Sequence, residues 1–189
     1  RGTIGRLAVR GPTGCRYMSD DRQREYVRGG WNLTGDSFYQ DEEGFFHFAA
    51  RSDDMIVSSG YNIAGPEVEA ALLSHPDVAE CAVIGVADAM KGQLPLGLVV
   101  LKAGVAKGHE DVVRELVARV REHIGAVAAF KQAAVVARLP KTRSGKVLRA
   151  TMRCIADGAA FTAPATIDDP KILDEIAAVL RGLGYAPKT

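Results

Sequence analysis

Residues 78–102 have the sequence VAECAVIGVADAMKGQLPLGLVVLK, which contains two short apolar runs. The first run covers residues 78–86 and the second covers residues 96–102, and both are rich in β-branched side chains. Such side chains are enriched in strands because they pack well on a pleated surface. Each run is therefore predicted to be a short strand.

Helical and extended patterns surround these two strands. A helix is predicted to start at Pro66 and to stop before Pro76, since proline is favoured in the first helical turn and breaks a helix further on. The other predicted elements are a short strand over 54–59, a helix over 110–124, a strand over 133–139, and helices over 146–156 and 170–180. This order predicts an α+β fold, with one small mixed sheet and flanking helices.

The chain changes character near Arg51. Before it, a strand is predicted over residues 4–10, a short exposed helix over 19–28 and a hairpin over 36–51. About fifty residues of this kind would make a poor core of their own. We therefore expect residues 1–51 to be the β-rich, C-terminal edge of a larger domain, and residues 52–189 to form a mobile C-terminal domain with an extra C-terminal helix.

Composition excludes several classes of protein. The chain has 24 Lys and Arg against 23 Asp and Glu, so its net charge of +1 offers no basic surface for nucleic acid or for a membrane. No apolar run approaches the roughly 18–20 residues that span a bilayer. The cysteines Cys15, Cys81 and Cys154 are odd in number and widely spaced, which predicts no metal site and no disulfide framework. A cytoplasmic location with reduced thiols is expected.

Three short segments carry residue types that are suited to chemistry. The first, residues 31–36, has the sequence WNLTGD. The ionised carboxylate of Asp36 can accept two hydrogen bonds from a vicinal diol such as that of a ribose. The alternative is that Gly35 and Asp36 simply form a turn.

The second segment, residues 51–60, has the sequence RSDDMIVSSG. Arg51 and Asp53 lie where the composition changes, which is where a hinge between two bodies would be. Gly60 permits the close approach of a backbone or a ligand chain. The alternative is a linker whose charged side chains are merely solvated.

The third segment, residues 140–146, has the sequence PKTRSGK and brings Lys141, Arg143 and Lys146 close together. Such a cluster suits a phosphate, or a carboxylate that is becoming a mixed anhydride. The segment is not a nucleotide-hydrolase phosphate loop, because Pro140 replaces its first glycine and Val147 replaces its Ser or Thr. An exposed basic turn is the alternative.

In this order, the three segments resemble those of the adenylate-forming superfamily, which includes acyl-CoA synthetases, peptide-synthetase adenylation domains and luciferases. The resemblance covers residues 2–153. Residues 1–92 are most similar to benzoate and 2-aminobenzoate CoA ligases, through the sequence ARSDDMIVSSGYNI. Residues 91–189 are more similar to propionyl-CoA and acetyl-CoA synthetases, through IGAVAAF and the tail ATIDDP. The resemblance implies an acid–CoA ligase and leaves the acid open.

The resemblance also implies a two-step reaction and a role for each motif. A carboxylate and ATP give an acyl-adenylate and pyrophosphate, and CoA then displaces AMP. Lys146 would be the catalytic lysine, and Asp36 and Arg51 would contact the ribose. Asp53 would be the hinge. Ser59 and Gly60 would line the channel for the pantetheine arm of CoA.

The implied cofactors are ATP or AMP, CoA, and Mg²⁺ carried by ATP in a full-length enzyme; no residue of this chain is expected to bind a metal itself. Two departures from the family pattern are Asn62, where many acetyl-CoA synthetases have arginine, and Ala50, where glycine is usual. The phosphate loop and acyl pocket of the large N-terminal domain are not in this sequence. The chain is therefore expected to be part of a longer ligase and to be inactive in adenylation alone.

Two other classes of function remain open. The chain could be a non-catalytic module that binds CoA or AMP, or that complements a separate N-terminal chain. It could also be a recombined product that folds without a function, although intact motifs argue against this.

Several residues outside the motifs are expected to be structural. His75 and His123 are predicted to be ordinary surface residues. Glu69 lies in the first turn of a helix, where the helix dipole favours a carboxylate, so no further role is assigned to it. Trp31 is expected to be a packing anchor for the segment that leads to Asp36. The aromatic cluster of Phe45, Phe46 and Phe48 is expected to lie in a core, and the alternative is a platform on which a nucleobase stacks.

Overall fold

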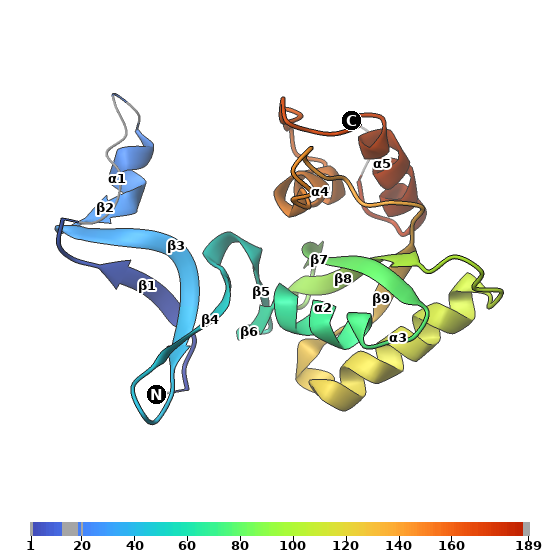
Figure 1. Cartoon of the computed structure of the whole chain (residues 1–189), viewed down its shortest axis with the longest axis horizontal. Coiled ribbons are helices and arrows are strands. Elements are labelled where there is room, and N and C mark those ends of the chain that lie inside the picture. Colours follow the sequence, from blue (N-terminus) through green and yellow to red (C-terminus); the bar gives the residue numbers. More distant parts are fainter. Residues whose placement is uncertain (1, 13–18, 20, 187–189) are drawn as a thin grey trace. The chain divides into compact units, whose positions relative to one another are not determined.

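The computed structural model describes residues 2–12, 19 and 21–186. The chain divides into two compact units, Arg1–Met55 and Ile56–Thr189 (Figure 1), and each is described by itself. The domains predicted as residues 1–51 and 52–189 stay a prediction.

The first unit is a four-stranded antiparallel sheet organised around one long strand. The strand β3 pairs with each of the other three strands, in the order β1-β3-β2 with β4 also on β3. The elements are β1 (Gly5–Val9), α1 (Arg22–Tyr26), β2 (Val27–Arg28), β3 (Trp31–Gln40), β4 (Phe46–Arg51) and the one-turn 3-10 helix η1 (Ser52–Asp54). The predicted strand and hairpin are both present. The helix predicted over 19–28 is shorter, because its last two residues pair with β3.

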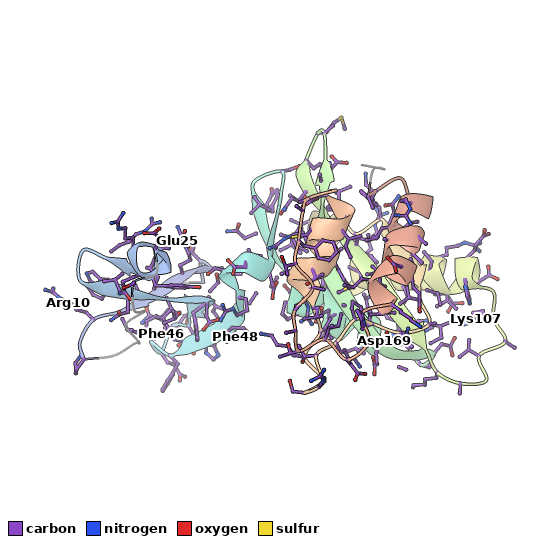
Figure 2. All side chains as sticks on the ribbon, turned by 90° about the horizontal axis from the view of Figure 1, so that it is seen from above. Arg10, Glu25, Phe46, Phe48, Lys107 and Asp169 are labelled. Atoms are coloured by element: carbon purple, nitrogen blue, oxygen red, sulfur yellow. The ribbon has the colours of Figure 1, made fainter. Side chains whose placement is uncertain are left out.

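Phe45, Phe46 and Phe48 are not core residues, so that prediction was wrong. They are 64%, 59% and 54% exposed, and Trp31 is 45% exposed. Phe46 and Phe48 are labelled in Figure 2. Among the described residues of the unit only Ser37 and Ala50 are buried. A single sheet has no second layer to cover the faces on which these rings lie.

The second unit contains a five-stranded mixed sheet, as predicted. Its central strand β8 pairs antiparallel with β7 on one side; on the other side it pairs antiparallel with β5 and, further along, parallel with β9. The strands are β5 (Met55–Ser58), β6 (Tyr61–Ala64), β7 (Val78–Asp88), β8 (Gly92–Leu101) and β9 (Gln132–Val135). The sequence analysis did not predict β6, which is four residues long.

Helices cover both faces of this sheet, so the α+β prediction is confirmed. The helices are α2 (Gly65–Leu73), α3 (His109–His123), α4 (Arg149–Ala156) and α5 (Ile172–Gly182), with a short 3-10 turn, η2 (Ala126–Ala128). Alternate side chains of β7 point to opposite faces. Ala82 and Ile84 pack with α4 and α5, whereas Cys81 and Val83 pack with α2 and α3. The two pairs of helices lie on opposite sides of β7 and β8 (Figure 1). Burial on both faces explains why β7 and β8 are almost continuously apolar.

The helix predicted over 146–156 begins later than predicted. A helix starting at Lys146 would need its carbonyl to accept a hydrogen bond from the next turn. That carbonyl instead accepts the Thr142 N–H at 2.9 Å, so Lys146 belongs to a loop and α4 starts at Arg149.

The cysteine predictions concern three residues, of which Cys15 lies outside the described residues. Cys81 and Cys154 are both free thiols. Burial, and then the nearby Glu69 carboxylate, raise the pKa of the Cys81 thiol to about 12. Cys81 is therefore a protonated, inert thiol of the core.

His75 is buried, at 3% exposure, so its prediction as a surface residue was wrong. Its Nδ1 accepts the Asp77 N–H at 3.2 Å, which places the proton of the neutral ring on Nε2. Nε2 lies 2.8 Å from the Glu115 carboxylate of α3. The Lys107 ammonium bridges Glu115, at 2.8 Å, and Asp77, at 3.1 Å. This cluster ties the end of α2 to α3, and only the fold brings its members together.

Removing the charge of Glu115 is expected to destabilise the chain in a pH-dependent way. The hydrogen bond from Lys107, and then that from His75, hold the pKa of Glu115 below its ordinary value of 4.5. A lowered carboxyl pKa contributes stability above pH 4.5, and this contribution is lost as the pH falls through the folded-state pKa. The thermal midpoint of Glu115→Gln should therefore lie below that of the unmodified chain at pH 7 and converge with it in acid.

Glu122→Gln provides the matched control, because Glu122 is an exposed carboxylate on α3 that makes no ion pair within the described part of the chain. The control should leave the midpoint unchanged at every pH. A Glu115 difference that stays constant down to strong acid would contradict the assignment.

Gly97 of β8 lies where no side chain fits without rearrangement. A Cβ at this position would lie 3.0 Å from Cζ of Phe130 and 3.2 Å from Cδ1 of Leu72. Gly97→Ala is expected to destabilise the chain by about 1–3 kcal/mol, since overpacking a close-packed core has this cost. Urea unfolding measures the change. Gly182→Ala is the control: nothing lies within 4 Å of its added Cβ, so stability should stay equal or rise.

Candidate functional site

Asp36 and Arg51, the two predicted ribose contacts, are cross-strand neighbours. They form a register pair between β3 and β4, and Nη1 of Arg51 lies 3.4 Å from Oδ1 of Asp36. The Asp36 side chain is 28% exposed and the Arg51 side chain is 51% exposed. The pair therefore presents a carboxylate and a guanidinium side by side, both accessible to solvent.

Gly35 is needed next to this pair for two reasons. Its φ of +78° belongs to the left-handed region that favours glycine. A Cβ here would also lie 3.2 Å from Nη2 of Arg51. The residue lies inside β3, so the alternative interpretation of Gly35 and Asp36 as a turn was wrong. The glycine makes room for the guanidinium beside Asp36.

Asp53, the predicted hinge, lies in η1 between β4 and β5. It is exposed, and the first compact unit ends at Met55. The hinge itself stays a prediction.

Ser59 and Gly60 form the two-residue turn between β5 and β6. Their φ values of +50° and +82° are those of a tight hairpin turn that matches the twist of the strands. The Ser59 N–H donates to the Lys91 carbonyl at 2.8 Å, which holds the turn against the hairpin of β7 and β8. Both residues are exposed, and nothing lies within 4 Å of the position of a Cβ on Gly60. The turn therefore leaves open space beside its backbone.

Lys146 lies near the tip of a hydrogen-bonded loop. Lys141 and Val147 form an antiparallel bridge, and the Lys146 N–H donates to Oγ1 of Thr142 at 3.1 Å. Gly145, with a φ of +84°, completes the turn. The Lys146 side chain is exposed, and no carboxylate of the described residues pairs with its amine. The loop backbone is therefore held by hydrogen bonds, while the Lys146 amine remains available to a ligand.

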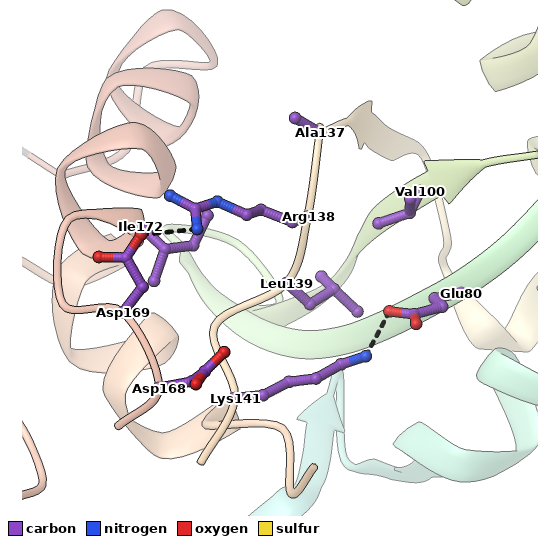
Figure 3. Close-up of a pocket in the computed structure, with 9 residues that line it drawn as sticks. All are labelled: Glu80, Val100, Ala137, Arg138, Leu139, Lys141, Asp168, Asp169 and Ile172. Atoms are coloured by element: carbon purple, nitrogen blue, oxygen red, sulfur yellow. Dashed lines mark hydrogen bonds and ion pairs between the residues drawn. The ribbon is translucent and has the colours of Figure 1, made fainter. Parts of the chain in front are cut away.

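The three cations of the predicted cluster are not equally available. Lys141 donates to Glu80 at 2.6 Å (Figure 3). Arg143 and Lys146 remain exposed near the tip.

A pocket of about 260 Å³ opens beside this loop in the second unit (Figure 3). Its lining residues are Glu80, Val100, Ala137, Arg138, Leu139, Lys141, Asp168, Asp169 and Ile172. Its cations are already neutralised, since Arg138 lies 2.7 Å from Asp169 and Lys141 lies 2.6 Å from Glu80. The side chains of Glu175 and Asp169 also raise the pKa of Arg138. No predicted site residue lines this pocket.

The only cluster of potential metal ligands among the described residues is His75, Asp77 and Glu115. The Lys107 ammonium already bridges the two carboxylates. Because Nδ1 of His75 accepts a backbone N–H, the other ring nitrogen carries the proton and cannot also bind a metal. The arrangement is that of an ion-pair cluster.

Sequence analysis assigned no role to Glu69, which is only 9% exposed and pairs with Arg149. The burial of Glu69 could have been predicted, because Glu69 precedes the core residue Leu72 by three positions and therefore shares its helix face. The helix dipole alone was taken to explain a carboxylate at this position, so the burial was missed. The predicted site residues thus fall into two groups: Asp36, Arg51 and Asp53 in the first unit, and Ser59, Gly60 and Lys146 in the second.

The sequence and the structure were compared with those of known proteins, and both comparisons indicate the same family. Residues 67–146 match the AMP-binding enzyme C-terminal domain. The chain is 56% identical over 181 residues to an uncharacterized protein of Pseudomonas aeruginosa, covering 93% of this chain and 29% of that protein. It is 48% identical over 147 residues to the mitochondrial acyl-CoA synthetase short-chain family member B of Dictyostelium discoideum, covering 78% of this chain and 21% of that protein.

Solved structures have the same fold. The anthranilate CoA ligase AuaEII, in complex with anthranoyl-AMP, superposes with a TM-score of 0.69 at 33% identity, covering 80% of this chain and 30% of that one. The chain spans less than a third of the length of each of these proteins. By these matches and by its motifs, the chain contains the C-terminal domain of the adenylate-forming acyl-CoA synthetase family.

Proposed function

We propose that this chain is the C-terminal portion of an acid–CoA ligase, which converts ATP, a carboxylic acid and CoA into acyl-CoA, AMP and pyrophosphate through an acyl-adenylate. The observation that carries the proposal is the Lys146 amine, which is held on a hydrogen-bonded loop without a carboxylate partner among the described residues. The family match ends at this residue.

Lys146 would supply the charge that adenylation requires. A carboxylate and a triphosphate repel each other, so a cation must bring them together and stabilise the charge that develops at phosphorus. An amine already paired with a carboxylate could not do this as well. A flexible side chain on a rigid loop combines a fixed position with a free charge.

Asp36 and Arg51 would hold the ribose of the adenylate. The Asp36 carboxylate accepts hydrogen bonds, which suits the two hydroxyls of a ribose. Arg51, whose nearer nitrogen lies 3.4 Å from the carboxylate, would keep that carboxylate oriented while donating to the ribose itself. The exposure of both side chains leaves room for a nucleotide.

Asp53, Ser59 and Gly60 would serve the second step. The hinge at Asp53 would let the domain that carries Lys146 withdraw after adenylation, so that a thiol can enter. The exposed turn at Ser59 and Gly60 would then line the pantetheine channel. Its open backbone supports this role, because a narrow arm can pass beside a glycine.

The proposed cofactors are ATP or AMP and CoA. Mg²⁺ would enter with the ATP phosphates, and no residue of this chain is assigned to it. The acid is proposed to be an aromatic or a short-chain carboxylic acid, since a short-chain acyl-CoA synthetase and an anthranilate CoA ligase are both similar to this chain. The missing N-terminal domain would supply its pocket and would be the main partner.

A cytoplasmic location without nucleic-acid or membrane partners is also proposed. In the described part of the chain, none of the helices has the length and apolar character needed to cross a bilayer.

Replacing Lys146 should separate the two steps of the reaction. In a full-length ligase that carries this chain, Lys146→Gln is expected to lower ATP–pyrophosphate exchange by about 10²–10³-fold, the usual effect of removing one electrostatic contact to a transition state. Thioester formation from preformed acyl-adenylate should change less than about threefold, since this step does not need the cation.

Lys141→Gln is the matched control for this loop. The Lys141 amine is paired with Glu80 and is not left available, so its replacement should lower exchange far less than the replacement of Lys146. Normal exchange in Lys146→Gln would overturn the proposed role.

The chain alone should show no ATP–pyrophosphate exchange with propionate, benzoate or 2-aminobenzoate. The reason is that Asp36 and Arg51 are solvated, and a solvated ribose contact contributes little affinity without an adenine pocket. Isothermal titration calorimetry with AMP and with CoA tests whether the chain is instead a non-catalytic binding module. Tight binding of either one without exchange would support a non-catalytic binding module, and exchange would show a phosphate site within these residues.

A further inference from the structure

Glu69 makes three hydrogen bonds at the outer edge of the second sheet. Its Oε1 accepts the Val83 N–H at 2.8 Å and the Arg149 Nε at 2.8 Å, while Oε2 accepts the Arg149 Nη2 at 2.8 Å. The Glu69 side chain is only 11% exposed, and the Arg149 side chain is 28% exposed. A two-pronged arginine–carboxylate pair of this kind fixes orientation as well as distance.

The pair connects elements on opposite faces of the sheet. Glu69 belongs to α2, which packs on one face, and Arg149 belongs to α4, which packs on the other. Strand β7 is the last strand in its sheet, so the Val83 N–H points outward and needs an acceptor. The Glu69 carboxylate satisfies this edge and reaches around it to Arg149.

Arg149 is the first residue of α4 and lies three residues after Lys146. No side chain caps the start of this helix. The Leu148 N–H donates to the Pro140 carbonyl at 2.9 Å, which closes the base of the loop. The pairing of Arg149 with Glu69 is therefore a side-chain ion pair that holds the helix-side stem of the Lys146 loop.

The opposite stem is held by the backbone. The Asp168 N–H donates to the Lys141 carbonyl at 3.0 Å, and the Arg143 N–H donates to the Thr166 carbonyl at 2.9 Å. The Lys141 stem thus has backbone bonds to the segment before α5 and an ion pair with Glu80, whereas the charge pair with Glu69 is what ties the helix-side stem to α2. A change at Glu69 would release the second stem while the first stays in place.

We propose that Glu69 and Arg149 are positioning residues for the Lys146 loop. This inference rests on the proposed function of Lys146. The pair touches no reacting group; it sets where the loop leaves the sheet and hence where the amine can reach. Displacement of a reacting group by about 1 Å can cost roughly 10²-fold in rate, so a modest loosening of the stem is sufficient to be measured.

Two variants disturb the pair with little loss of volume. Glu69→Gln keeps an acceptor for the Val83 N–H, but it turns an amide NH₂ toward the guanidinium and removes the charge. Arg149→Lys keeps the charge and loses the two-pronged geometry. In the full-length ligase, each variant is expected to lower the rate constant of ATP–pyrophosphate exchange by about 10–100-fold, with the KM for ATP within about threefold of normal.

The second half-reaction distinguishes positioning from a folding defect. Thioester formation from preformed acyl-adenylate does not use Lys146, so both variants should retain it within about threefold. A merely structural role would lower both half-reactions together. Hydrogen exchange of the 189-residue chain gives a second readout: the Thr142 and Gly145 amides of the loop should exchange faster, while the amides of α3 should not.

Glu115→Gln is the matched control, because it removes a glutamate ion pair of α3, which packs with α2 on the face of the sheet that does not carry α4. It should leave exchange of pyrophosphate and the loop amides unchanged. Glu69→Gln combined with Lys146→Gln should be no slower in adenylation than Lys146→Gln alone, since a positioning residue has nothing left to position.

The outcomes separate the two proposals. If Lys146→Gln retains adenylation, the proposed function fails. If Lys146→Gln loses adenylation while Glu69→Gln and Arg149→Lys keep it, or lose both half-reactions equally, the positioning role alone is overturned.

Discussion

The carboxylate of Glu69 is the point on which the architecture of the second unit depends. It completes the outer edge of β7 through the Val83 N–H, and it pairs with Arg149 from the opposite helix layer. A sheet covered on both faces normally joins its two layers only through strand side chains. Here the Glu69–Arg149 pair joins the two helix layers around the edge strand β7, and Arg149 is the first residue of α4.

The Glu69–Arg149 pair also bears on how the domain holds the exposed Lys146 amine in place. The Lys146 loop is closed by its own backbone, and its two stems are attached to different parts of the unit. In the first unit, the backbone also positions the side chains of Asp36 and Arg51. Two neighbouring strands place them in register, and Gly35 leaves space for the guanidinium. In both units polar side chains are positioned by backbone pairing and are left accessible.

Elements with a strong period were predictable from the residues alone. The helix over 110–124 was predicted almost to its ends, because its buried side chains Val112, Leu116 and Val120 recur on one face. The strands over 78–86 and 96–102 were also predicted, although each is longer in the structure. Contacts between residues far apart in the sequence were not predicted: His75 is buried and lies within hydrogen-bond distance of Glu115, and Lys141 pairs with Glu80.

Periodicity and short motifs are local properties of a chain, so the residues alone were enough to predict the fold class, the family and the candidate site residues. Which charges are paired and which remain available depends on packing in three dimensions. Glu69 and Arg149 are eighty positions apart, and Asp36 and Arg51 meet only through strand register. Charge pairing depends on distances across the fold, and these are set by packing rather than by any neighbouring residue.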